Sequence, residues 1–149
     1  MKVKDLLQEG KGAFRTLEPD QSVDQAIKLM SGYQLSGLVI VDKESSQGIF
    51  TERDLVRCHI LFPQKDLSQI PVSDVMTAKL IVARPDDTVE EAMGMMMKAK
   101  IRHLPVVEDG KITSLLTLEE LVKKHVRVLT RELHYLQDYI TDLQDAAHD

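Results

Sequence analysis

The chain has 149 residues, of which 43% are hydrophobic, so it is long enough to bury a core in one compact unit or in two small, mutually dependent ones. Its net charge of −5 is spread without runs of one sign, which argues against a nucleic-acid-binding or membrane-surface protein. The first residues lack the apolar segment of a signal peptide, and no uncharged run approaches the roughly 18 residues that span a bilayer. Because Cys58 is the single cysteine, we expect a cytoplasmic protein without an intrachain disulfide or a cysteine-based metal cluster.

The first half of the chain reads as strand, helix, strand, strand and helix. The motif Ser22-x-x-Gln25 is a capping box, in which the hydroxyl accepts a free helical N–H and the third side chain reaches back. Runs rich in Val, Ile and Leu between polar residues indicate the strands. The expected elements are a strand over 14–17, a helix of about three turns from Ser22, strands over 38–41 and 48–51 joined by a loose loop over 43–47, a helix from Thr51, and a connection over 57–71.

The second half repeats this order at an offset of 66 residues. Between 19–56 and 85–122, ten of the 38 residue pairs are identical and no gap is needed, so the chain is a tandem duplication. Thr88-x-x-Glu91 is the second capping box, and Asp109-Gly110 favours a tight hairpin turn. The expected elements are a strand over 80–83, a helix from Thr88, strands over 104–107 and 112–117, and a helix from Thr117.

A long amphipathic helix is expected from about Leu118 to near the end of the chain. No Gly or Pro occurs over 111–149, and apolar residues recur in alternating steps of four and three. Such a seam favours self-association, although packing back onto its own domain is the alternative. The seam consists of Val122, Val126, Leu129, Leu133, Leu136, Ile140, Leu143 and Ala147.

Neither copy alone could easily bury enough apolar area to be stable. We therefore expect an α+β (α/β) fold in which the copies pack sheet face to sheet face around a pseudo-two-fold axis. Two equivalent clefts should lie where the copies meet, and such clefts are usual places for small ligands. The expected divisions are a first repeat over 1–62, a linker over 63–71, a second repeat over 72–125 and a C-terminal amphipathic helix over 126–149.

Four motifs, in this order and at repeat spacing, resemble the tandem CBS domain pair, or Bateman module. The resemblance covers residues 1 to about 125 and is closest to small stand-alone bacterial CBS-pair proteins. It implies a regulatory module that binds an adenine nucleotide such as AMP, ADP, ATP or NAD between the repeats. The motifs are Gly48-Ile49-Phe50-Thr51-Glu52-Arg53-Asp54, Val72-Ser73-Asp74-Val75-Met76-Thr77, Arg102-His103-Leu104-Pro105-Val106-Val107 and the duplicated Pro-Asp-x-Ser/Thr-Val.

In one cleft the motifs bring together groups that suit a nucleotide. Asp54 could accept both hydroxyls of a ribose, and the helix start at Thr51 offers N–H donors to a phosphate. We expect positive charge from Arg102 and His103 of the other repeat, with Arg53 as a weaker third candidate. The resemblance implies a ligand contact at Thr77. The expected apolar walls for the adenine are Ile49, Val82 and Ile101.

The other cleft has a degenerate set of residues. Ser114 replaces the motif glycine, and Glu120 replaces the aspartate with a side chain that is one methylene longer. Ser36 and Gly37 stand where Arg102 and His103 stand in the first cleft. We therefore expect this cleft, with Thr117 at its helix start, to be empty or weakly binding.

Several motifs have a plainer interpretation. Thr51-x-x-Asp54 and Thr117-x-x-Glu120 are also capping boxes, which does not conflict with ligand binding. Met30, Met76 and the methionines of 93–97 are expected to fill the core or an interface. Cys58 beside His59 lacks a third catalytic partner and is expected to be structural.

The leading hypothesis is a binding module that acts as an energy or redox sensor in signal transduction, without catalysis. Catalysis would require a nucleophile with a base, a carboxylate pair, a metal cluster or a phosphate-cradling glycine loop, and the sequence shows none of these. Neither a metal nor a required cofactor is expected. The alternative is a structural module that dimerises or binds a partner while its clefts stay empty. Expected partners are a second copy, bound through the CBS helices and the C-terminal helix, and an effector protein.

Overall fold

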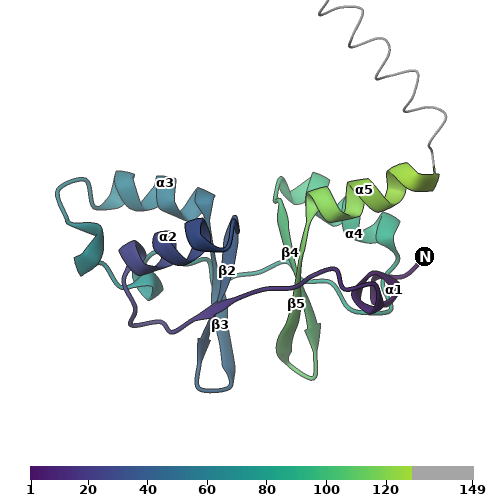
Figure 1. The fold of residues 1–149 in the computed structure, drawn as a ribbon, viewed down its shortest axis with the longest axis horizontal. Coiled ribbons are helices and arrows are strands. Elements are labelled where there is room, and N and C mark those ends of the chain that lie inside the picture. Colours follow the sequence, from purple (N-terminus) through teal and green to yellow (C-terminus); the bar gives the residue numbers. More distant parts are fainter. Residues whose placement is uncertain (129–149) are drawn as a thin grey trace, which may run out of the picture.

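The computed structural model describes residues 1–128, with no side-chain detail for 126–128. The predicted tandem arrangement is confirmed: two repeats stand side by side, each with a β-hairpin at the centre of the molecule and helices beside it (Figure 1). The apolar seam predicted from Leu129 onward lies outside the described residues.

The first repeat contains a three-stranded sheet. β1 runs parallel to β2, and β2 pairs antiparallel with β3, with a bulge between Ile40 and Val41. The Ser22 hydroxyl accepts the Gln25 N–H at 3.1 Å and caps the first long helix, but the return bond from the Gln25 side chain that the predicted capping box requires is not made. The elements are β1 (Thr16–Leu17), α2 (Val23–Gly32), β2 (Gly37–Asp42), β3 (Ser45–Thr51) and α3 (Glu52–Leu61).

The second repeat has the same order without a full counterpart of β1. Its hairpin pairs antiparallel with a bulge between Val106 and Val107, and both bonds of the Thr88 capping box are made, at 3.0 and 3.2 Å. Short 3-10 turns over Leu67–Gln69 and Val72–Asp74 connect the repeats. The elements are α4 (Val89–Ala99), β4 (His103–Glu108), β5 (Lys111–Thr117) and α5 (Leu118–Val128).

Several predicted elements differ from the structure, among them the connection predicted over 57–71, because α3 continues to Leu61. The strand predicted over 14–17 is only two residues long, and the one over 80–83 is reduced to a single parallel bridge between Ala83 and Val106. The loose loop predicted over 43–47 is instead a two-residue turn, because Ser45 already pairs with Asp42. A polar run at the exposed end of a hairpin can complete the backbone ladder as well as an apolar one, so its composition was misleading.

Each repeat is completed by a segment that lies outside its own stretch of sequence. The N-terminal helix α1 (Val3–Gln8) buries Val3 and Leu6 in the core of the second repeat, beside Leu104 and Leu116. In the same way, Ile70, Val72 and Val75 are buried in the core of the first repeat. Figure 1 shows α1 beside the second repeat, with the chain crossing from there to the first repeat. The packing therefore crosses the boundaries expected at 62 and 72.

A third apolar cluster joins the two repeats. Val39 and Ile49 of the first hairpin and Leu115 of the second are buried together, and Phe14 and Leu80 pack against them. Phe14 and Leu80 are mates at the offset of 66 and lie on the two segments that cross between the repeats. The shared cluster fixes the two hairpins against each other.

Candidate functional site

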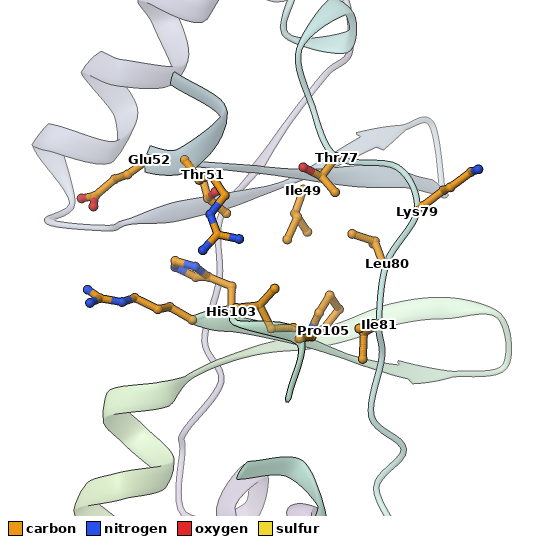
Figure 2. Close-up of a pocket in the computed structure, with 13 residues that line it drawn as sticks. Ile49, Thr51, Glu52, Thr77, Lys79, Leu80, Ile81, His103 and Pro105 are labelled. Carbon is orange, nitrogen blue, oxygen red and sulfur yellow. The ribbon is translucent and has the colours of Figure 1, made fainter. Parts of the chain in front are cut away.

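A cavity of about 460 Å³ lies between the repeats, at the cleft for which nucleotide binding is predicted. Thr51, Glu52 and His103 lie at one end and Lys79 at the other, with Ile49, Leu80 and Pro105 between them (Figure 2). Both repeats therefore contribute walls. Of the residues predicted for this cleft, those that line the cavity are Ile49, Thr51, Arg53, Thr77, Ile101, Arg102 and His103.

Asp54 does not line the cavity but lies directly behind it. Its side chain is buried, with 2% of the residue exposed. One carboxylate oxygen accepts the Thr77 hydroxyl at 2.7 Å, and the other accepts the Thr51 backbone N–H at 2.9 Å. Asp54 thus caps α3 and orients two residues that do face the cavity.

Arg57 completes this arrangement from one turn further along α3. Its guanidinium lies 3.3 Å from the Asp54 carboxylate and donates to the backbone carbonyls of Val75 and Met76. The start of α3 and the segment 75–77 are therefore tied together through one buried carboxylate and one arginine. Sequence reasoning missed Arg57; the signal was a cation one turn after a buried acid.

The basic end of the cleft is less charged than the sequence suggests. Burial lowers the pKa of His103 below its ordinary value of 6.5, and the nearby carboxylates, Glu52 first, only oppose this effect. The imidazole is therefore neutral at pH 7. Its Nε2 lies 2.8 Å from the Ser36 hydroxyl, so this side chain bridges the two repeats. Formal positive charge at this end comes from Arg53 and Arg102.

The apolar walls differ in part from those predicted. Ile49 and Ile101 line the cavity, but Val82 does not. Val82 directly precedes Ala83, which is buried and bridges to Val106 on the sheet of the second repeat. The crossing segment contributes Leu80 and Ile81 instead. Glu52 directly follows Thr51, and the segment after Thr77 supplies three more of the lining residues. The lining residues that the sequence analysis missed are Glu52, Lys79, Leu80, Ile81, Ala99 and Pro105.

At the position of the second predicted cleft, the carboxylate of Glu120 already forms hydrogen bonds within the protein. One of its carboxylate oxygens accepts the Thr117 N–H at 3.0 Å, and the other accepts the Gly12 N–H at 3.0 Å. Gly12 also accepts the Leu115 N–H through its carbonyl oxygen. There is little room beside Gly12, because a Cβ at this position would lie 3.0 Å from the Ser114 Cβ. The longer carboxylate therefore reaches the crossing segment itself.

Ser36 and Gly37 are also engaged within the protein. Ser36 is the partner of His103, and a Cβ on Gly37 would lie 3.0 Å from the His103 ring. Ser36 and Gly37, which correspond to Arg102 and His103 in the repeat, thus pack against His103 of the first cleft. Neither residue carries a positive charge.

The sequence profile of the CBS domain family matches residues 3–60 and 72–127. The chain belongs to the CBS domain family. The first match begins at residue 3 and therefore includes α1, although α1 packs in the core of the second structural repeat.

Similar proteins extend this result. The chain is 31% identical to a candidate signal-transduction protein with CBS domains from Burkholderia ambifaria, with a TM-score of 0.78 over 85% of this chain and 95% of that one. It is 26% identical to CBSX2 in complex with AMP, with a TM-score of 0.69 over 85% and 97% of the two chains. It is also 38% identical over 112 residues to inosine-5'-monophosphate dehydrogenase from Aquifex aeolicus, covering 73% of this chain. The chain spans only 22% of that enzyme's length.

Cys58 and the methionines do not line the cavity of the CBS pair. Cys58 lies within α3, not in a linker as predicted, and its burial raises the pKa of the thiol. Met30 and Met96 are buried in the two cores, whereas Met97 is 71% exposed on α4. Among the described residues, no helix is both long and apolar enough to span a membrane.

Proposed function

We propose that this CBS pair is a regulatory module that binds one adenine nucleotide per chain in the first cleft and passes on its presence through the packing of the two repeats. The observation that carries the proposal is the cavity at the Thr51 end of α3. It combines an apolar middle, arginines from both repeats at one end, and an oriented pair of threonines backed by a buried carboxylate. The AMP complex of the similar protein CBSX2 supports the choice of ligand class.

The ribose is assigned to the Thr51 and Thr77 side of the cleft. A carboxylate has about four lone-pair positions, and Asp54 already uses them on the Thr51 N–H, the Thr51 hydroxyl at 3.5 Å, the Thr77 hydroxyl and Arg57. The two ribose hydroxyls therefore bind Asp54 by replacing the hydroxyls of Thr77 and Thr51. Because Thr77 lies on the segment that crosses between repeats, this exchange gives ligand binding a direct mechanical route to the inter-repeat geometry.

The phosphate is assigned to the end formed by Arg53, Arg102 and the start of α3. Guanidinium groups bind phosphate through paired N–H donors, and neutral His103 can add a hydrogen bond without adding charge. The adenine lies between Ile49 and Ile101, with Leu80 and Ile81 as the opposite wall in place of Val82. No step in this assignment transfers a group or a proton, so the module senses its ligand and leaves it unchanged.

The nucleotide can shift repeat packing only as far as it binds one arrangement better than another. Ligands consistent with an energy or redox sensor are AMP, ADP, ATP and NAD. The receiver of the signal is an effector protein or a second copy of the chain. Exposed apolar side chains that could form the helical contact with a second copy are Val56, Ile60 and Leu61 on α3, Met97 on α4 and Val122 on α5.

A thermal-shift and calorimetric panel of AMP, ADP, ATP, NAD, cyclic AMP and S-adenosylmethionine tests the proposal. A ligand at a hundred times its Kd that binds only the folded state stabilises it by about 2.7 kcal/mol, so the unfolding midpoint must rise. We expect a shift with at least one adenine nucleotide, at a stoichiometry of one per chain. Asp54→Ala should abolish the shift, and Asp54→Asn should weaken it while preserving more of the fold.

Glu120→Ala is the matched control, because it removes the equivalent carboxylate from the other cleft. It should retain the nucleotide shift in full. A flat panel for the wild type contradicts the sensor function. A flat panel together with a dimeric mass by light scattering would favour the second candidate, a structural dimerisation or partner-binding module. The exposed apolar side chains on α3 and α4 support that candidate.

A further inference from the structure

The carboxylate of Glu52 stands at the phosphate end of the first cleft. Glu52 lines the cavity, and its side chain lies at the same end as Thr51 and His103, away from Lys79 (Figure 2). Its residue is exposed, and no ion pair neutralises it among the described side chains. An acidic group at an anion-binding end of a cleft calls for an explanation.

The cations at that end are few. Arg102 is exposed, and Arg53 already donates to the Lys100 carbonyl at 2.6 Å. His103 is neutral and engaged with Ser36. Two guanidinium charges minus the Glu52 charge leave a small positive surplus. That surplus suits one phosphate group, which carries between one and two negative charges at neutral pH.

We propose that Glu52 is a specificity-determining residue that makes the first cleft select nucleoside monophosphates over di- and triphosphates. The inference rests on the proposed function of this cleft. Each further phosphate adds negative charge beyond the first, in the direction of the exposed mouth where the Glu52 carboxylate lies. A monophosphate ends before that position and is held by the arginines. The outer phosphates of a triphosphate lie closer to the Glu52 carboxylate, which repels them.

The repeat comparison supports a role beyond helix stability. An acidic residue in the first turn of a helix also interacts favourably with the helix dipole, and α5 meets that need with Glu119 and Glu120. The mate of Glu52 at the offset of 66 is Leu118, so the acid directly after the capping threonine is present only in the repeat whose cleft is open. Removing it should therefore change ligand preference and not merely the stability of α3.

The experiment measures the ratio of the Kd values for ATP and AMP by calorimetry, with EDTA present so that no Mg²⁺ masks the phosphate charge. For the wild type we expect AMP to bind about tenfold more tightly than ATP. Glu52→Gln should strengthen ATP binding by about three- to tenfold, since one repulsive contact near the surface is worth about that factor. AMP binding should change by less than about twofold.

Two further variants isolate the charge. Glu52→Asp keeps the negative charge and should keep the wild-type ratio. Glu44→Gln makes the same change in net charge at the β2–β3 turn, away from the cleft lining, and should also leave the ratio unchanged. An unchanged ratio in Glu52→Gln, or an equal change in Glu44→Gln, overturns the role of Glu52 while leaving nucleotide binding intact. Absence of binding by every nucleotide to the wild type overturns both this role and the proposed function.

Discussion

The two clefts of this CBS pair are built from the same motif and differ in what the motif carboxylate does. Asp54 accepts the Thr77 hydroxyl and the Thr51 N–H from behind an open cavity. Glu120 reaches one methylene further and accepts the backbone N–H of Gly12 on the crossing segment. The length of the carboxylate side chain therefore decides what it binds on the crossing segment. The shorter Asp54 accepts the Thr77 hydroxyl, which faces the cavity, whereas the longer Glu120 accepts the Gly12 backbone N–H.

The position of a glycine differs in the same way. In the first repeat the glycine is Gly48, on β3, and it faces the Thr77 carbonyl across the contact. In the second repeat its mate is Ser114, and the glycine lies on the opposite side of the contact, at Gly12. Each contact between a strand and a crossing segment thus needs one glycine. In the first repeat the glycine is on the strand, and in the second it is on the crossing segment. Each of the three predictions that follow changes the first cleft and is paired with a control variant elsewhere in the chain.

The largest effect is expected from Gly48→Ala. The new Cβ would lie 2.5 Å from the Thr77 carbonyl oxygen, which is backbone and cannot rotate away. The paired hydrogen bonds between Ile49 and Thr77, of 3.0 and 2.8 Å, would be forced apart. Overpacking of this kind should cost about 2–3 kcal/mol of unfolding free energy, measured by urea denaturation, and should abolish the nucleotide-induced shift.

Gly94→Ala is its control. Nothing lies within 4 Å of the position that its Cβ would take in α4, so this change should stabilise the protein by up to about 1 kcal/mol and keep the shift. Wild-type stability in Gly48→Ala would show that the crossing segment is not held against β3.

The repeat made most of this architecture predictable. Its offset, the capping boxes and the Val- and Ile-rich runs predicted both hairpins and all four of the helices that flank them, because each pattern is local in the sequence. The exchange of Val3 and Leu6 onto the second repeat was not predicted, since a short amphipathic segment carries no signal for which of two similar cores it enters. Ser45 was misassigned to a loop for the related reason that ladder pairing depends on the partner strand.

The site was predictable to the extent that a motif lies on one element. Thr51 and Arg102 line the cavity because their elements end at it. Val82 was placed there by its apolar character alone, and the direction of its side chain depends on the bridge made by Ala83. The burial of Asp54 and the engagement of Glu120 with Gly12 depend on side chains from distant segments. Spacing within one motif does not contain that information.

A second, smaller effect is expected from exchanging the two carboxylates. Asp54→Glu inserts a methylene into a buried site and should cost about 1–2 kcal/mol of unfolding free energy. It should also weaken AMP binding by about tenfold or more, because an extra 1.4 kcal/mol of misplacement corresponds to that factor. Calorimetric titration of AMP and urea denaturation on the same samples measure both quantities.

The reciprocal change, Glu120→Asp, shortens the side chain so that it no longer reaches the Gly12 N–H. Loss of that hydrogen bond should cost about 1 kcal/mol and leave AMP binding unchanged. If Glu120→Asp weakened AMP binding as much as Asp54→Glu does, the two clefts would be coupled, and the assignment of the ligand to the first cleft alone would be wrong.

The smallest effect is the pH dependence that the first cleft owes to His103. Because burial lowers its pKa in the folded state, the unfolded chain takes up a proton first as the pH falls through the ordinary value of 6.5. The unfolding free energy should therefore decrease below about pH 6.5 and level off once the pH is below the folded-state pKa. The contribution of the neutral imidazole is fully present above that range.

His103→Gln should remove this part of the pH dependence while retaining a donor for Ser36, and His59→Gln, on the exposed side of α3, should retain the wild-type curve. Urea denaturation at pH values from 5 to 8 measures the difference. The mate of His103 is Gly37, so the second cleft has no titratable group at this position. Parallel stability curves for wild type and His103→Gln would mean that the imidazole protonates equally well in both states, and then charge at the phosphate end would no longer be limited to the two arginines.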